Sequence, residues 1–217
     1  ASKFDPGSKQ YMVSRKDALT INTPKDKTRV KKYTKAMYDK FEGKIPYVTI
    51  DDPDAKTPQG DPLLAVYDVI DKKVVINVAL ANPEAPMHEY LHPFVTEMML
   101  TNPKLFDNLL KEVLENDKGK ELLTEIADME TYKERATPLI TSIQFMLETS
   151  GNDVSKMSSK DLYEVMLKKD SSNRDIAQEL ITSSISSEAY AKTPSKLRQI
   201  VDKIINYIKT KLFGPIW

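Results

Sequence analysis

The hydrophobic pattern at the start of the chain predicts a polar arm followed by one helix. Residues 1–27 are polar without a clear period, and we expect them to form an extended N-terminal arm. In residues 28–42 the apolar side chains recur at helical spacing, and Gly43 follows as a stop signal. The first folded domain is therefore expected to begin near residue 28.

The next segments change to the shorter period of β-strands. Tyr47–Ile50 is short, aromatic and β-branched, which predicts a strand. Two β-rich runs at 63–70 and 74–80 flank a short polar turn and predict a β-hairpin. Residues 51–62 are dense in Asp and Pro and are expected to form a loop. The pattern thus predicts a small antiparallel sheet.

Helical signals follow the hairpin. Residues 82–86 (NPEAP) offer an N-cap and prolines suited to the first turn of a helix. Strands that precede helices, rather than alternating with them, indicate an α+β fold. We expect a domain spanning 28–150 and a helical C-terminal extension spanning 151–217. Further helices are expected at about 102–116, 120–135, 138–147, 159–169, 174–191 and 194–212.

Composition narrows the classes of function. The 32 basic and 32 acidic residues cancel, so charge gives no argument for a nucleic-acid partner. The chain has no cysteine, which excludes disulfides, thiolate metal sites and cysteine catalysis. No apolar run approaches the length of a membrane span, and residues 1–10 lack the pattern of a signal peptide. A cytoplasmic location is therefore expected.

One motif carries chemistry. Residues 88–92 read His-Glu-Tyr-Leu-His, and these are the only 2 histidines of the chain. The i, i+4 spacing puts both imidazoles on one helical face, where they can bind one Zn²⁺. Glu89 is turned by about 100° around the helix axis, which places its carboxylate beside the metal. There it can act as the general base toward a water that the metal activates.

The residues around the motif support a helix anchored on the core. Apolar side chains recur on one face, and the histidines lie off the centre of this stripe, so they can face a cleft. Two randomly placed histidines would stand four apart in only about 1 chain in 100. Pro93 directly follows the second histidine and should kink or end the helix there. The stripe consists of Met87, Leu91, Phe94 and Met98.

A hairpin followed by a helix bearing HEYLH resembles the zincin superfamily of metallopeptidases over roughly residues 46–150. The resemblance implies that His88 and His92 bind zinc, that Glu89 is the base, and that a later helix brings a third ligand. Val95 and Met98 stand where the metzincin branch has Gly and His, so that branch is excluded. Since no histidine or cysteine remains, a carboxylate or a water must complete the site, which resembles the gluzincin branch.

We expect Glu134 to be this third ligand. It lies where the chain changes from charged to strongly apolar, near the first turns of an expected buried helix. Glu130, one turn earlier, is the main alternative, and Asp128 is a candidate hydrogen-bond partner for a ligand histidine. The other candidate ligands are Glu112, Glu115, Glu121, Glu125 and Glu148. The oxyanion stabiliser is left open among Tyr132, Arg135, Tyr163 and Tyr190.

The expected function is zinc-dependent hydrolysis of peptide bonds. The segment HEYLHPFV also resembles zincin-like segments of tailed-phage virion proteins, which implies a virion-associated location as an alternative. The rival function is therefore a non-catalytic structural or interaction protein with a vestigial or metal-stabilised motif. The helix expected at 194–212 has one apolar and one basic face. We expect it to dock on the core or on a protein partner, with a membrane surface as the alternative.

Overall fold

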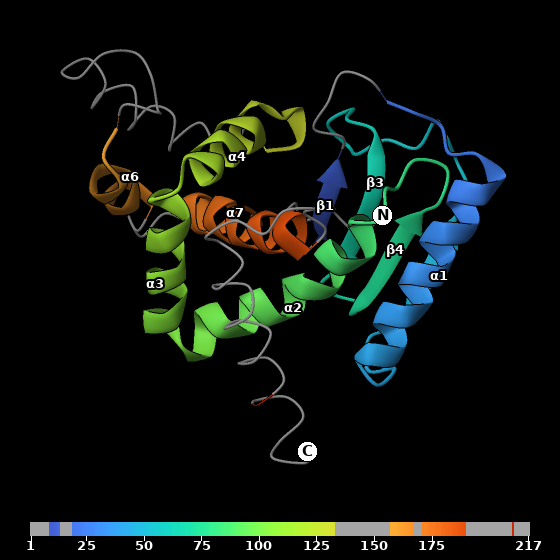
Figure 1. The fold of residues 1–217 in the computed structure, drawn as a ribbon, viewed down its shortest axis with the longest axis horizontal. Helices are drawn as coiled ribbons and strands as arrows, with labels where there is room; N and C mark the ends of the chain where they lie inside the picture. Colours follow the sequence, from blue (N-terminus) through green and yellow to red (C-terminus); the bar gives the residue numbers. More distant parts are fainter. Residues whose placement is uncertain (1–8, 14–18, 133–156, 167–170, 190–209, 211–217) are drawn as a thin grey trace.

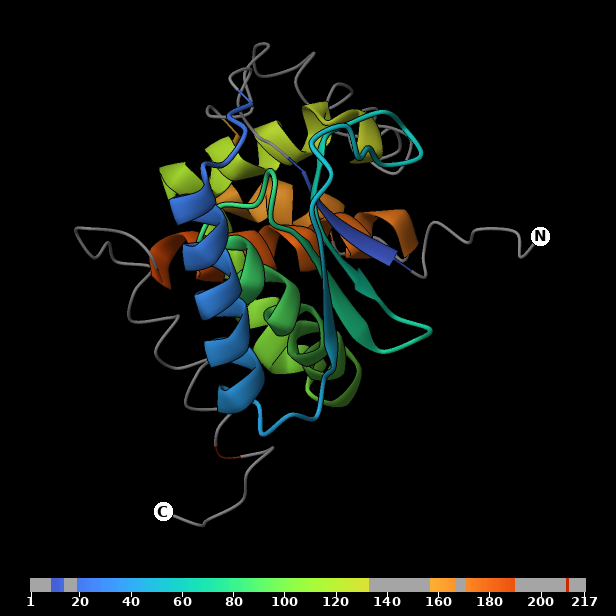
Figure 2. The ribbon, with the colours of Figure 1, turned by 90° about the vertical axis from the view of Figure 1, so that its right-hand side faces the viewer.

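The computed structural model describes residues 9–13, 19–132, 157–166, 171–189 and 210. Figure 1 shows a small sheet and α1 on one side of the molecule and α3, α4, α6 and α7 on the other. Helix α2 (Ala85–Thr101) runs between the two sides. Seen from the side of α1 (Figure 2), α2 lies between α1 and the strands, which it contacts. The predicted α+β class is confirmed.

The sheet has four strands in the order β1-β3-β4-β2. The predicted hairpin is confirmed as β3 (Leu63–Asp68) and β4 (Lys73–Asn77), which pair antiparallel. The predicted strand β2 (Tyr47–Ile50) pairs parallel with β4, so the sheet is mixed and not wholly antiparallel. The chain reverses twice between β2 and β4, at the loop 51–62 and at the hairpin, which returns β4 to the direction of β2.

The N-terminal region contributes more structure than its polar sequence predicted. Within the expected arm, β1 (Lys9–Val13) forms the other edge of the sheet, antiparallel to β3. Helix α1 (Pro24–Lys40) begins four residues before the predicted start. Thr23 caps it, and the side chains and backbones of Thr23 and Asp26 exchange hydrogen bonds in a capping box. These caps lie upstream of the first apolar helical position, so the hydrophobic period alone does not mark them.

The described helices of the second half agree with four of the predicted segments. None of the helices in this described part is long and apolar enough to cross a membrane. The helices predicted at 138–147 and 194–212 lie outside the described residues, apart from residue 210. The helices are α3 (Pro103–Leu114), α4 (Asp117–Asp128), α6 (Ser159–Met166) and α7 (Ser171–Ala189).

The sequence predicted that α2 kinks or ends at Pro93. The helix does not end there and continues to Thr101. Proline removes only the hydrogen bond to the carbonyl of Glu89, and packing supports the helix beyond it. Phe94 stacks on Phe41 with ring centroids 4.8 Å apart. Further along, Val95 and Met98 are buried. Burial of these apolar side chains beyond Pro93 outweighs the missing hydrogen bond.

Candidate metal centre

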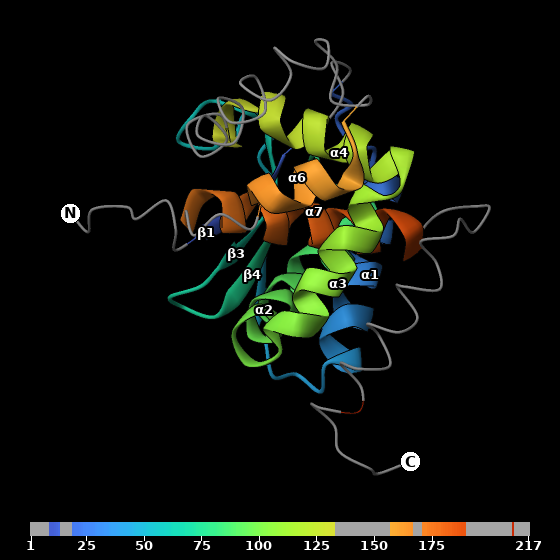
Figure 3. The same cartoon turned by 90° about the vertical axis from the view of Figure 1, so that its left-hand side faces the viewer.

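The first two turns of α2 are buried on every side. On the side of α1, Tyr90 stacks on Phe41, the C-cap residue of that helix, with an interplanar angle of 4°. The hydroxyl of Tyr90 donates to the carbonyl oxygen of Ile45 at 3.0 Å. On the other side, α7 packs against α2 (Figure 3). Its Glu179 lies against the face of α2 that bears His88 and His92. The exposed fraction is 0% for His88 and 1% for His92. The histidines therefore face a helix, not the open cleft expected from the sequence.

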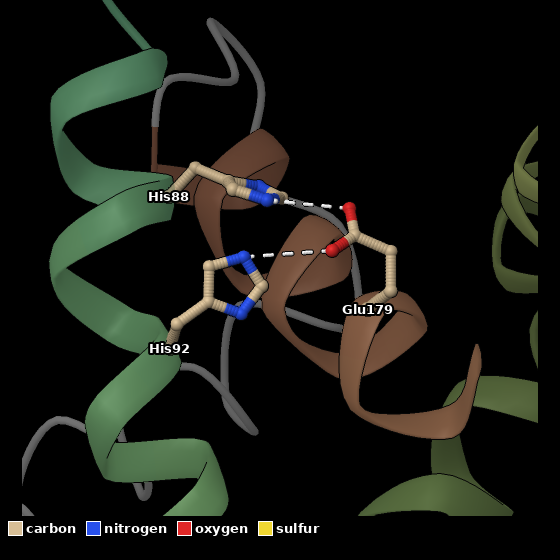
Figure 4. A group of neighbouring side chains, drawn as sticks. All are labelled: His88, His92 and Glu179. Carbon is tan, nitrogen blue, oxygen red and sulfur yellow. Dashed lines mark ion pairs between the residues drawn. The ribbon is translucent and has the colours of Figure 1, made fainter. Parts of the chain in front are cut away.

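Glu179 of α7 meets both histidines. Its Oε1 lies 3.2 Å from Nε2 of His88, and its Oε2 lies 3.5 Å from Nε2 of His92 (Figure 4). One ligand atom from each of the three residues lies within 4.8 Å of the others, and all three side chains are buried. The two helices thus bring two imidazoles and one carboxylate to a single point.

The group of three could hold a metal ion, and the expected zinc gives a scale for its distances. Ligand atoms held about 2.0–2.2 Å from zinc at tetrahedral angles lie about 3.3–3.6 Å from one another. The two nitrogen–oxygen distances of 3.2 and 3.5 Å are close to that separation. Two imidazoles and one carboxylate are also the three-ligand set that catalytic zinc sites use. The three residues could therefore hold one metal ion between α2 and α7.

The ring nitrogens of the histidines are available to a metal. Among the described residues, Nε2 of His88 and both ring nitrogens of His92 lack a hydrogen-bond partner. Burial, and then the nearby His88, lower the pKa of His92 to about 3, while Glu179 opposes this shift. His92 is therefore neutral at pH 7, and neutral imidazole is the form that binds metals. Buried polar atoms without partners are costly, and a bound cation would remove that cost.

Two hydroxyl groups of α7 contact members of the group of three. Nδ1 of His88 lies 3.3 Å from Oγ of Ser186, and that hydroxyl donates to Oε1 of Glu84 at 2.9 Å. The hydroxyl of Ser183 donates to Oε1 of Glu179 at 3.0 Å. Asp128, the predicted partner of a ligand histidine, is exposed at the end of α4 instead. The partner of His88 is thus a serine of the same helix that carries Glu179.

Glu89 is fully buried in the first part of α2 and does not belong to the group of three. Its place one residue after His88 turns it away from the line between the two imidazoles. Its assignment as general base remains a prediction.

The predicted third ligand, Glu134, lies outside the described residues, as do Glu148, Arg135 and Tyr190. The alternative Glu130 is exposed and is not part of the metal-binding group found among the described residues. Of the remaining candidate ligands, Glu112 is half-buried, and Glu115, Glu121 and Glu125 are exposed. Of the candidates for the oxyanion role, Tyr132 is buried and Tyr163 is half-buried.

Glu179 was not among the ligands considered from sequence. The signal that could have found it is its setting between Ala177 and Leu180, within a run of apolar and small side chains that is buried from 176 to 186. A lone carboxylate in such a run needs a compensating charge or hydrogen bonds. A scan of protein-family models and searches of curated proteins and solved structures found no match for this chain. The resemblance to zincins therefore rests on the site.

Proposed function

We propose that this chain is a zinc-dependent peptidase of the gluzincin type. In this proposal His88, His92 and Glu179 bind the metal, and Glu89 is the general base. The observation that carries it is the meeting of the HExxH helix with a glutamate from a later helix, at distances that suit one zinc ion. Glu179 takes the part that the sequence analysis gave to Glu134.

The roles of the side chains follow from their chemistry. Zinc, when bound, would polarise the scissile carbonyl and lower the pKa of an attacking water to about 7. Glu89 would accept the proton of that water and pass it to the leaving amine. Glu89 is fully buried, so this proton transfer would take place away from bulk water. The histidines and Glu179 orient the reaction by holding their donor atoms on one side of α2.

The test is Glu89→Gln, with Glu97→Gln as the matched control. Both are glutamates of α2, but Glu97 is exposed and lies outside the site. Glu89→Gln should keep zinc binding and lower hydrolysis of a peptide library by about 100-fold or more, because the base is lost. Glu97→Gln should leave both properties unchanged. Equal cleavage by wild type and Glu89→Gln would show that Glu89 is not the base.

A second candidate function is a structural or interaction protein with a metal-stabilised motif, such as a virion component. The near-complete burial of His88 and His92 between α2 and α7 favours it, because a peptide substrate must reach the metal. Structural zinc is closed by four protein ligands, whereas catalytic zinc keeps an open position. Zinc binding without any cleavage by the wild type, and a fourth protein ligand, would select this function over the peptidase.

A further inference from the structure

The hydroxyl of Ser186 connects a histidine of α2 to a carboxylate at the start of the same helix. Ser186 has one proton, and its Oγ lies 2.9 Å from Oε1 of Glu84 but 3.3 Å from the carbonyl oxygen of Ser183. A carboxylate is the stronger acceptor, so the proton is donated to Glu84. The hydroxyl of Ser187 donates to the same Glu84 oxygen at 3.2 Å. Two hydroxyl donors thus converge on one oxygen of Glu84.

The direction of this hydrogen bond determines the tautomer of His88. Since Ser186 gives its proton to Glu84, it meets Nδ1 of His88 with a lone pair, 3.3 Å away. Nδ1 must then carry the imidazole proton, and Nε2 is left with its lone pair. That lone pair faces Oε1 of Glu179 at 3.2 Å, an oxygen that already accepts from Ser183. Two acceptors that face each other in a buried place repel each other, and a bound cation would relieve this repulsion.

We propose that Ser186 and Glu84 are positioning residues, which hold His88 in the Nδ1–H tautomer so that Nε2 is its metal-binding atom. This inference rests on the metal site of the proposed function, but not on its catalytic activity. It also gives α7 two tasks, because Glu179 and Ser186 stand seven residues apart, about two turns along the same helix. Glu179 offers a ligand atom of its own, and Ser186 orients His88, a ligand on α2.

The test uses nitrogen-15 NMR of the metal-free protein, because ring nitrogen shifts distinguish a protonated from an unprotonated nitrogen. Only 2 histidines contribute signals, and a His92→Gln variant assigns them. In the wild type, His88 should show a protonated Nδ1 and an unprotonated Nε2. Ser186→Ala should shift His88 toward the other tautomer and weaken zinc affinity by about 10- to 100-fold, the scale for partners of metal ligands.

The matched control is Ser184→Ala. Ser184 is a buried serine of the same helix, and its hydroxyl donates to the carbonyl oxygen of Leu180 within the helix. It should leave both the tautomer and the zinc affinity unchanged, which separates the proposed role from a general effect on α7. Glu84→Gln leaves Ser186, the direct partner of His88, in place, and it should shift the same signals in the same direction by a smaller amount.

Two results would overturn the inference. One is a wild-type His88 protonated on Nε2. The other is a Ser186→Ala variant that matches Ser184→Ala in tautomer and zinc affinity. A protein that shows the predicted tautomer and zinc dependence but cleaves no peptide would instead overturn the peptidase function and support the positioning role.

Discussion

Helices α2 and α7 both contribute side chains to the candidate metal site, but only the sequence of α2 carries a recognisable motif for it. Helix α2 holds two ligands and the proposed base within five residues, 88–92, so helical spacing alone places them. Helix α7 supplies one carboxylate, Glu179, and a hydroxyl, Ser186, without a recognisable motif. The contribution of α2 is local, whereas that of α7 exists only once the two helices pack. Tests of the site should therefore separate the two contributions.

The largest effect should come from α2. His88→Ala or His92→Ala removes one of three ligands and leaves the other two unable to hold the ion. Zinc binding, measured by titration calorimetry and by elemental analysis of the purified protein, should be abolished in both variants. Wild-type protein should bind about one zinc per chain. A histidine variant that takes up zinc like the wild type would remove α2 from the site.

The contribution of α7 should be comparable in size. Glu179→Ala should weaken zinc binding about as much as the loss of a histidine, since it removes the only anionic ligand of the group found among the described residues. Glu134→Ala is the matched test of the prediction from sequence and should leave zinc affinity unchanged. Glu130→Ala should also have little effect, because Glu130 is exposed. A larger loss of zinc affinity in Glu134→Ala than in Glu179→Ala would instead support Glu134, the ligand predicted from the sequence.

A smaller effect should appear in the stability of the fold. Zinc that joins α2 to α7 binds the folded chain only, so zinc at 100 times its dissociation constant should add about 2.7 kcal/mol to the free energy of unfolding. Thermal unfolding followed with zinc and with a chelator should show this difference. The difference should be absent in Glu179→Ala. Equal stabilisation of that variant would mean that zinc does not connect the two helices through Glu179.

The smallest effect concerns pH in the metal-free protein. The pKa of His92 is about 3 in the folded chain, below the ordinary value of 6.5. Between these values the unfolded chain binds a proton that the folded chain does not, so stability is lost as the pH falls below about 6.5. His92→Gln should reduce this loss. Denaturant unfolding of both proteins between pH 7.5 and 5.5 would check it, with parallel pH profiles as the contradicting result.

The sequence was most informative where a pattern is complete within one element. The hairpin and β2 have alternation or β-branched residues of their own, and α3 has its own N-cap, Asn102. The parallel pairing of β2 with β4 has no such local mark, because it depends on how two reversals bring the strands together. The position of Glu179 opposite His88 is non-local in the same sense. Reasoning along the chain therefore favoured glutamates closer to the motif in sequence, whereas Glu179 is the one that the fold brings to the histidines among the described residues.

The most direct test of the shared site is a crystal structure of the zinc-loaded protein with anomalous scattering recorded at the zinc edge. Our account predicts one anomalous peak between α2 and α7, about 2.0–2.2 Å from Nε2 of His88, Nε2 of His92 and a carboxylate oxygen of Glu179. A peak whose carboxylate ligand is Glu134 or another residue would contradict the role of α7. The absence of any peak at the two histidines would contradict the metal site itself.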